Sequence, residues 1–177
     1  LVDELSRLQD HVPPFPFDDV RRIVEDEMGL PMDAVYAEVD PVPVAAASIA
    51  QVHYATLKTG EPVVIKVQRP SLHQQITGDL RILAGLASVL ESHVPETRPF
   101  RPRAIVEEFT KSLQRETDFL AEAASMERYR KMFEDEPGLC IPRPFPEWTR
   151  RRVLTMERVE GVKVTDVEAL KSLDVDL

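Results

Sequence analysis

Pro62-Val63-Val64-Ile65-Lys66-Val67-Gln68 is a short apolar run that contains a single lysine. Because side chains alternate across a strand, the run places Lys66 on one face and its neighbours Ile65 and Val67 on the other. A lone ammonium in such a strand needs solvent, a carboxylate or a ligand phosphate, since an unpaired buried charge is costly. An edge-strand lysine kept for solubility fits the pattern too, and the run by itself favours that interpretation.

The segments around this strand change the balance. Residues 50–57 alternate as a second strand, and Lys58-Thr59-Gly60-Glu61 connects the two runs as a hairpin. Further along the chain, after one predicted helix, comes a long predicted helix that carries acidic residues. A loop, a hairpin, a strand lysine and a helix carboxylate occur in this order in the upper lobe of a protein kinase.

Composition sets the limits of the interpretation. The chain has 177 residues, 43% hydrophobic and 30% charged, which is typical of a globular domain. Its net charge of −9 argues against nucleic acid as a partner. The single Cys140 excludes an internal disulfide and suits a reducing compartment. The four histidines show no ligand spacing, so we predict no metal site.

The first forty residues predict three elements. Residues 1–9 have the spacing of a helix end, and the three prolines of residues 12–17 predict an extended path anchored by phenylalanines. A helix is predicted from Asp18 to about Met28, followed by a strand over residues 35–39. Residues 45–50 contain no glycine, so by themselves they predict a short helical turn, although a loop over a nucleotide is the alternative.

Two helices are predicted after the lysine strand, over residues 71–93 and 102–133. The uncharged stretch 82–90 in the first helix is far shorter than the roughly 20 residues that cross a bilayer, so we expect a packing helix. In the second helix, Glu116 falls on the apolar stripe between Leu113 and Leu120. A carboxylate there is either paired or the helix phase is wrong. Which acid of this helix pairs with Lys66 stays open, and a merely exposed acidic face is the alternative.

Four motifs resemble the UbiB/ADCK (AarF-type) atypical kinase family: A-A-A-S-I-A-Q-V-H at 45–53, V-V-I-K-V-Q-R-P at 63–70, E-T-D-F-L-A-E-A at 116–123 and L-T-M-E-R-V-E-G at 154–161. The stretch L-S-R-L-Q-D-H-V-P-P-F-P at 5–16 resembles the family's N-terminal extension. The resemblance implies an α+β fold: a protein-kinase-like N-lobe with a small antiparallel sheet, a family-specific inserted helix and an N-terminal helical extension. The C-lobe, apart from its start, is expected to be absent from these 177 residues. It divides the chain into the end of the extension (1–32), the N-lobe (33–160), and the hinge exit with the start of the C-lobe (161–177).

The resemblance also implies a site that binds ATP or ADP with Mg²⁺. Lys66 would contact the α- and β-phosphates and pair with a helix carboxylate, and Glu116 and Asp118 would be the family's ExD pair over the nucleotide. The metal ligands are expected in the C-lobe. The remaining nucleotide-binding residues are expected in the alanine-rich loop, the strand after it and the hinge: Ala45, Ala46, Ala47, Ser48, Val52, Met156, Glu157 and Val159.

By the same resemblance, the full-length protein is an ATPase or unorthodox kinase that supports the biosynthesis of ubiquinone or another isoprenoid lipid. The expected partners are adenine nucleotide, a lipid or membrane surface, and lipid-biosynthesis proteins. The expected location is cytoplasmic, at the bacterial inner membrane, with attachment through parts outside this chain. The usual catalytic loop and D-F-G triplet are missing, so we expect no ATP turnover by these 177 residues alone. A nucleotide-gated lipid-binding or scaffold module, and a plain interaction domain with a structural Lys66, remain the alternatives.

Overall fold

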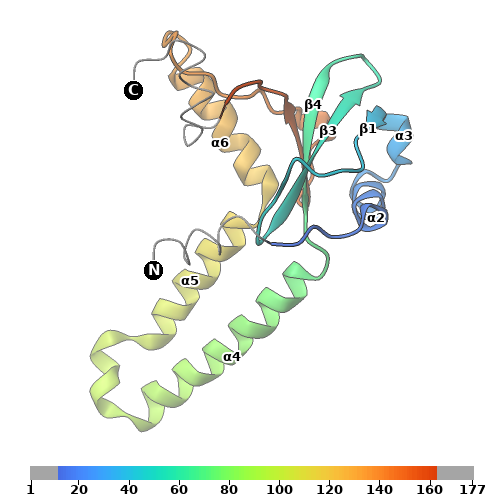
Figure 1. The fold of residues 1–177 in the computed structure, drawn as a ribbon. Coiled ribbons are helices and arrows are strands. Elements are labelled where there is room, and N and C mark those ends of the chain that lie inside the picture. Colours follow the sequence, from blue (N-terminus) through green and yellow to red (C-terminus); the bar gives the residue numbers. More distant parts are fainter. Residues whose placement is uncertain (1–11, 163–177) are drawn as a thin grey trace.

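A five-stranded antiparallel sheet forms the centre of the molecule, seen in a computed structural model that describes residues 12–162 (Figure 1). Helix α2 covers one face of the sheet and helix α6 the other, while α4 and α5 extend away from the sheet as a helical hairpin (Figure 1). This arrangement confirms the predicted α+β fold with a small antiparallel sheet. The predictions for residues 1–11 and 163–177 lie outside the described residues.

The sheet follows the predicted hairpin closely. Its strand order is β1-β3-β4-β5, with the short β2 paired to β3. In register, Lys66 on β4 lies opposite Val52 on β3 and Leu154 on β5. The strands are β1 (Tyr36–Val39), β2 (Ala45–Ala46), β3 (Ala50–Leu57), β4 (Pro62–Gln68) and β5 (Val153–Glu157).

One hydrophobic core fills the space between the sheet and α2 (Phe17–Met28), with the short helix α3 (Met32–Val35) beside it. The odd-numbered side chains of β4 pack there and are fully buried, as the alternation predicts. Gly29 ends α2 in the left-handed conformation at φ 69°, which glycine adopts without strain. Burial of each such aliphatic side chain contributes about 1.5–3 kcal/mol to the stability of the fold, so packing against α2 holds β4 in place.

A buried polar chain attaches the proline-rich segment to the sheet. The Gln51 side chain accepts a hydrogen bond from the Phe15 N–H (2.9 Å) and donates to the Phe15 carbonyl (3.2 Å). The same amide donates to Nε2 of His53 (2.8 Å), and Nδ1 of His53 then donates to the Asp40 carbonyl (2.8 Å). Burial lowers the pKa of His53, in keeping with the neutral ring that this pattern requires. The predicted extended, phenylalanine-anchored path is confirmed, and Phe15 is buried.

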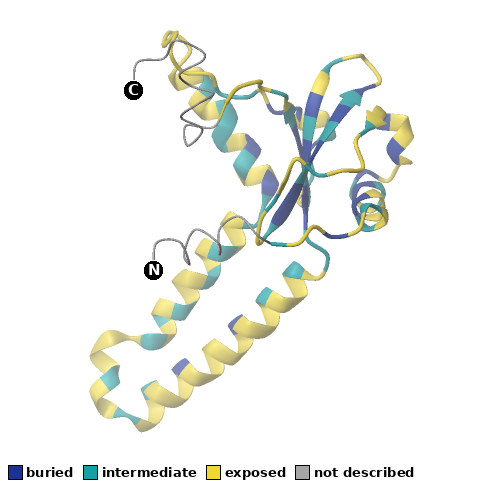
Figure 2. Ribbon diagram, viewed as in Figure 1, coloured by how far each residue is buried: buried dark blue, intermediate teal, exposed yellow. Residues whose placement is uncertain are grey.

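The helical hairpin that extends away from the sheet consists of α4 (Leu72–His93), a 3₁₀ helix η1 (Pro95–Phe100) and α5 (Pro102–Glu116). The predicted helix 71–93 is therefore confirmed, but its expected packing face is not: Ile82, Leu83, Leu86, Val89 and Leu90 are all exposed. Only Leu80 and Ala87 of α4 are buried, so most of the hairpin surface is exposed (Figure 2). Among the described residues, no helix combines the length and the apolar character needed to cross a membrane.

The predicted single helix 102–133 is wrong. Helix α5 ends at Glu116, and a new helix, α6 (Phe119–Met132), begins after Thr117 and Asp118. Asp118 has extended backbone angles (φ −102°, ψ 104°), and its carboxylate accepts the Leu120 N–H (3.0 Å), which is the geometry of a helix N-cap. The apolar stripe predicted for a continuous helix therefore does not form.

The helical turn predicted for residues 45–50 is also wrong. Ala45 and Ala46 form β2 and pair with Val52 and Gln51 of β3. The chain then turns back, and the Ala47 N–H donates to the Ala50 carbonyl (2.8 Å). Cross-strand pairing to the edge of β3 satisfies the backbone of this segment in place of helical hydrogen bonds, which overrides the helix propensity of alanine.

Candidate functional site

The side chain of Lys66 forms an ion pair with a carboxylate of α6, the helix that covers the same face of the sheet. Its Nζ lies 2.8 Å from both Oε1 and Oε2 of Glu122 on α6. It also lies 4.8 Å from the centre of the Phe119 ring, a cation–π distance. The two side chains are 22% and 37% exposed, so the ion pair is half-buried at the edge of an accessible surface. An ammonium fixed in this way can still reach a phosphate.

Helix α6 places Glu122 because its own apolar stripe faces the sheet. Phe119 and Ala123 are buried, and Met126 packs against the same small core. Glu122 stands between Phe119 and Met126 in helical steps of three and four, so it lies on the same face. The core also contains Leu154, the β5 neighbour of Lys66.

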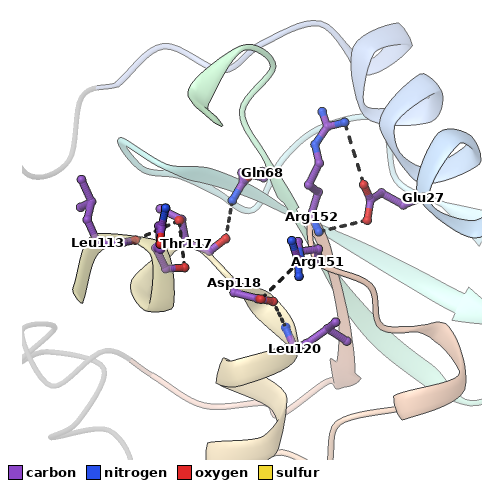
Figure 3. Close-up of polar contacts among 9 residues, drawn as sticks. Glu27, Gln68, Leu113, Thr117, Asp118, Leu120, Arg151 and Arg152 are labelled. Carbon is purple, nitrogen blue, oxygen red and sulfur yellow. Dashed lines mark hydrogen bonds and ion pairs between the residues drawn. The ribbon is translucent and has the colours of Figure 1, made fainter. Parts of the chain in front are cut away.

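The start of α6 is fixed to the sheet by hydrogen bonds. The buried Gln68 side chain donates to the Thr117 carbonyl (2.7 Å) (Figure 3). The Phe119 N–H donates to the Arg151 carbonyl (3.1 Å). The Thr117 hydroxyl donates back to the Leu113 carbonyl (2.9 Å), which closes the end of α5. These contacts determine where α6 begins and therefore which of its residues meet Lys66.

The alanine-rich segment forms a hairpin loop beside β3. Ala45, Ala47 and Ser48 are exposed, and Ala46 is half-buried. Arg69 ties the loop down, because its Nε donates to the Ala47 carbonyl (2.8 Å) and its Nη2 to the Pro13 carbonyl (2.9 Å). The loop thus has the place of a kinase phosphate loop without glycine.

The other predicted nucleotide contacts lie along the same sheet face and at its end. Val52 and Met156 are half-buried, and both share the face of Lys66 by strand alternation. Glu157 ends β5, and its N–H donates to the Arg143 carbonyl (2.8 Å), so this N–H is already satisfied within the chain. Val159 follows β5 and is 47% exposed.

The structure does not bring Glu116 to Lys66. Glu116 is exposed at the last position of α5. Asp118 caps α6 and forms an ion pair with Arg151 (3.5 Å). The choice of acid that the sequence left open is therefore decided: Glu116 is not the partner of Lys66, and Glu122 is. The catalytic roles of Lys66, Glu116 and Asp118 stay predictions.

Sequence reasoning missed Glu122 because it carried one helical phase through the break. Thr117-Asp118 is a typical N-cap sequence, and Asp118 precedes an apolar residue. Once the helix starts at Phe119, Glu122 falls on the buried face. This signal was present in the sequence.

The chemistry of these residues fits a nucleotide. The accessible ammonium suits a phosphate, and the half-buried valine and methionine suit an adenine ring. In residues 12–162, no three histidine, cysteine, aspartate or glutamate side chains come together as a potential metal site.

A lysine on a sheet strand, bonded to a glutamate of the helix that covers the same face, is the arrangement of the upper lobe of a protein kinase. Comparison with known proteins agrees. The sequence model described as "ABC1 atypical kinase-like domain" matches residues 7–177. The chain therefore belongs to the ABC1 atypical kinase-like family, which confirms the resemblance to UbiB proteins.

Individual relatives support the same family. "Probable protein kinase UbiB" of Marinobacter nauticus is 39% identical over 179 residues, covering 100% of this chain and 32% of that protein. "Uncharacterized protein sll1770" of Synechocystis is 41% identical over 175 residues, covering 99% of this chain and 30% of that protein. The chain thus spans about a third of the length of the curated relatives it matches.

A solved structure shows the same fold. The Rv3197–erythromycin complex from Mycobacterium tuberculosis superimposes with a TM-score of 0.77 at 27% identity. The match covers 87% of this chain and 38% of that chain. Together with the strand order and the Lys66–Glu122 pair, it supports a kinase N-lobe-like fold.

Proposed function

We propose that this chain is the nucleotide-binding upper lobe of a UbiB-type ATPase or phosphotransferase. The observation that carries the proposal is the half-buried Lys66–Glu122 pair on an accessible sheet face. Holding the ammonium at a fixed point before the nucleotide arrives reduces the entropy lost when a phosphate binds.

The proposal gives a specific role to each residue that would contact the nucleotide. Lys66 contacts the α- and β-phosphates of ATP or ADP, and Glu122 orients it. Val52 and Met156 contact the adenine ring, and the Glu157 carbonyl and the Val159 backbone bind its polar edge. The loop Ala45-Ala46-Ala47-Ser48 covers the phosphates. Bound Mg²⁺ would neutralise phosphate charge, and its ligands are proposed to lie in parts of the protein beyond this chain.

The biological role proposed here rests on the relatives' names. Several are called UbiB, and they come from bacteria such as Marinobacter nauticus and Pseudomonas aeruginosa. We infer that the full-length protein supports the biosynthesis of ubiquinone or another isoprenoid lipid at the inner membrane, where lipid and lipid-biosynthesis proteins would be its partners.

Titration calorimetry with Mg-ADP tests the proposal on the full-length protein. Lys66→Met should weaken binding at least about tenfold, because one charge-assisted contact to phosphate is lost. Lys58→Met is the control, since Lys58 is exposed in the β3–β4 turn. Equal affinity of the Lys66→Met variant and the wild type would contradict the proposal. Binding without ATP hydrolysis by the full-length protein would instead favour the scaffold alternative.

A further inference from the structure

A cavity lies on the side of the sheet where α4 and α6 begin. It is bounded by the end of β4, the first turn of α4, the second half of α5 and the residues before β5. Its volume of about 920 Å³ is ample for a small organic ligand. We call it the basic pocket, because its walls carry five cationic side chains: Arg69, Lys111, Arg115, Arg151 and Arg152.

This concentration of positive charge contrasts with the rest of the chain. The whole sequence has a net charge of −9, whereas the basic pocket has five cations and only two acids, Glu108 and Asp118. Gathering like charges around a cavity raises the local potential and attracts anions.

The ion pairs of the pocket are weak enough to yield to a ligand. Glu108 lies 3.7 Å from Lys111 and 3.5 Å from Arg115, and all three side chains are 67–69% exposed. Arg151 lies 3.5 Å from Asp118 and is 75% exposed (Figure 3). Exposed pairs at such distances contribute little to stability, so their cations remain available for a stronger anion.

Fixed groups surround these adaptable ones. Arg152 donates its backbone N–H to Glu27 (3.3 Å), and its guanidinium lies 4.0 Å from the same carboxylate, so its charge already has a partner (Figure 3). Gln68 is buried with its amide on the Thr117 carbonyl (Figure 3). Arg69 is held by the Ala47 and Pro13 carbonyls. The pocket therefore has a fixed base and an exposed rim of three cations, Lys111, Arg115 and Arg151, whose weak pairs a phosphate can replace.

The basic pocket is separate from the nucleotide site. Lys66, Glu122, the alanine-rich loop and Met156 do not line it. Asp118 is the only residue that it shares with the residues predicted for catalysis.

We propose that the basic pocket binds an anionic ligand through a phosphomonoester or diphosphate group. Arginine side chains bind phosphate oxygens with two parallel hydrogen bonds, and Lys111 adds a point charge. The volume leaves room for an organic group beyond the phosphates, lodged against Leu72 and Ala121. The phosphate belongs either to a soluble metabolite or to a lipid headgroup.

Pyrophosphate is the probe for this proposal. The full-length protein is titrated on a Lys66→Met background, which weakens binding at the nucleotide site. The comparison between pocket and control variants on this background does not depend on whether the nucleotide proposal holds. The Lys111→Ala/Arg115→Ala pair should weaken pyrophosphate binding at least about tenfold. The matched control is Arg103→Ala/Lys131→Ala, whose side chains are 62% and 74% exposed in similar weak ion pairs outside the pocket.

Alanine keeps α5 helical, and an unchanged melting temperature of each variant verifies its fold. Cosedimentation with phosphatidylcholine vesicles, with and without phosphatidic acid, identifies the source of the phosphate. If the Lys111/Arg115 pair lowers vesicle binding as well, the ligand is a lipid headgroup; if it lowers only pyrophosphate binding, the ligand is soluble. No binding of pyrophosphate at millimolar concentration, or equal weakening by both pairs of substitutions, would overturn the proposal.

Discussion

The Lys66–Glu122 contact predicts a specific energetic coupling. At 2.8 Å, with an effective dielectric constant of about 20, the gross attraction between the two charges is about 6 kcal/mol. Most of it is offset by solvent screening of the side chains, which are 22% and 37% exposed, by desolvation of their buried parts and by side-chain entropy. Together with the Phe119 ring contact, we expect a net coupling of about 1–2 kcal/mol.

A double-mutant cycle measures this coupling. Lys66→Met, Glu122→Gln and the double variant are unfolded in urea, and the free energy of unfolding is followed by fluorescence of Trp148, the single tryptophan of the chain. A parallel cycle pairs Lys66→Met with Glu116→Gln and should give a coupling near zero. The reasoning is refuted if the Glu116 cycle shows the larger coupling, because Lys66 would then be paired with α5 instead of α6.

Two further predictions concern the frame of the site. Asp118→Ala should lower the free energy of unfolding by about 1 kcal/mol through loss of the α6 N-cap, whereas Asp118→Asn should retain most of it; equal urea midpoints for both variants would contradict the cap. Burial lowers the pKa of His53 below its ordinary value of 6.5, so the unfolded chain binds a proton at a higher pH than the folded chain does. The free energy of unfolding is therefore largest above about pH 6.5 and decreases as the pH falls below it. Between about pH 6.5 and pH 5, the melting temperature should therefore depend less on pH in His53→Gln than in the wild type. An identical pH dependence in the two proteins would contradict the role given to His53.

The sheet could be predicted because its signals are local. Alternation in residues 50–57 and 62–68, with a turn containing Gly60, gives both the hairpin and the face of Lys66. Helix α4 was also predictable, because apolar residues recur at helical steps from Ile76 to Leu90. In both cases each residue depends on near neighbours in the chain.

The partner of Lys66 could not be found from that periodicity, because it depends on where a helix restarts. A break at Thr117 and Asp118 changes the direction and phase of the helix, and every residue after it turns to a different face. The break is fixed by Gln68, which lies 49 positions away in the sequence. A long-range hydrogen bond of this kind leaves no periodic pattern.

The alanine-rich loop was predicted wrongly for a different reason, because here the local sequence pattern itself was misleading. Local propensity favours a helical turn in residues 45–50, but the free edge of β3 offers hydrogen bonds to the same backbone. Arg69, which follows β4 directly, then holds Ala47 from the side. Tertiary pairing overrides propensity here, and only the position between two strands indicated a loop over a nucleotide.

Labelling with an acyl-phosphate derivative of ATP tests the central claim most directly, since such a reagent acylates the lysine beside the bound phosphates. On the full-length protein, mass spectrometry should show Lys66 modified, and an excess of Mg-ATP should suppress the modification. Lys58, exposed in the β3–β4 turn, should react weakly and independently of Mg-ATP. The nucleotide site would be contradicted if Lys66 stayed unmodified or if its modification were the same with and without Mg-ATP.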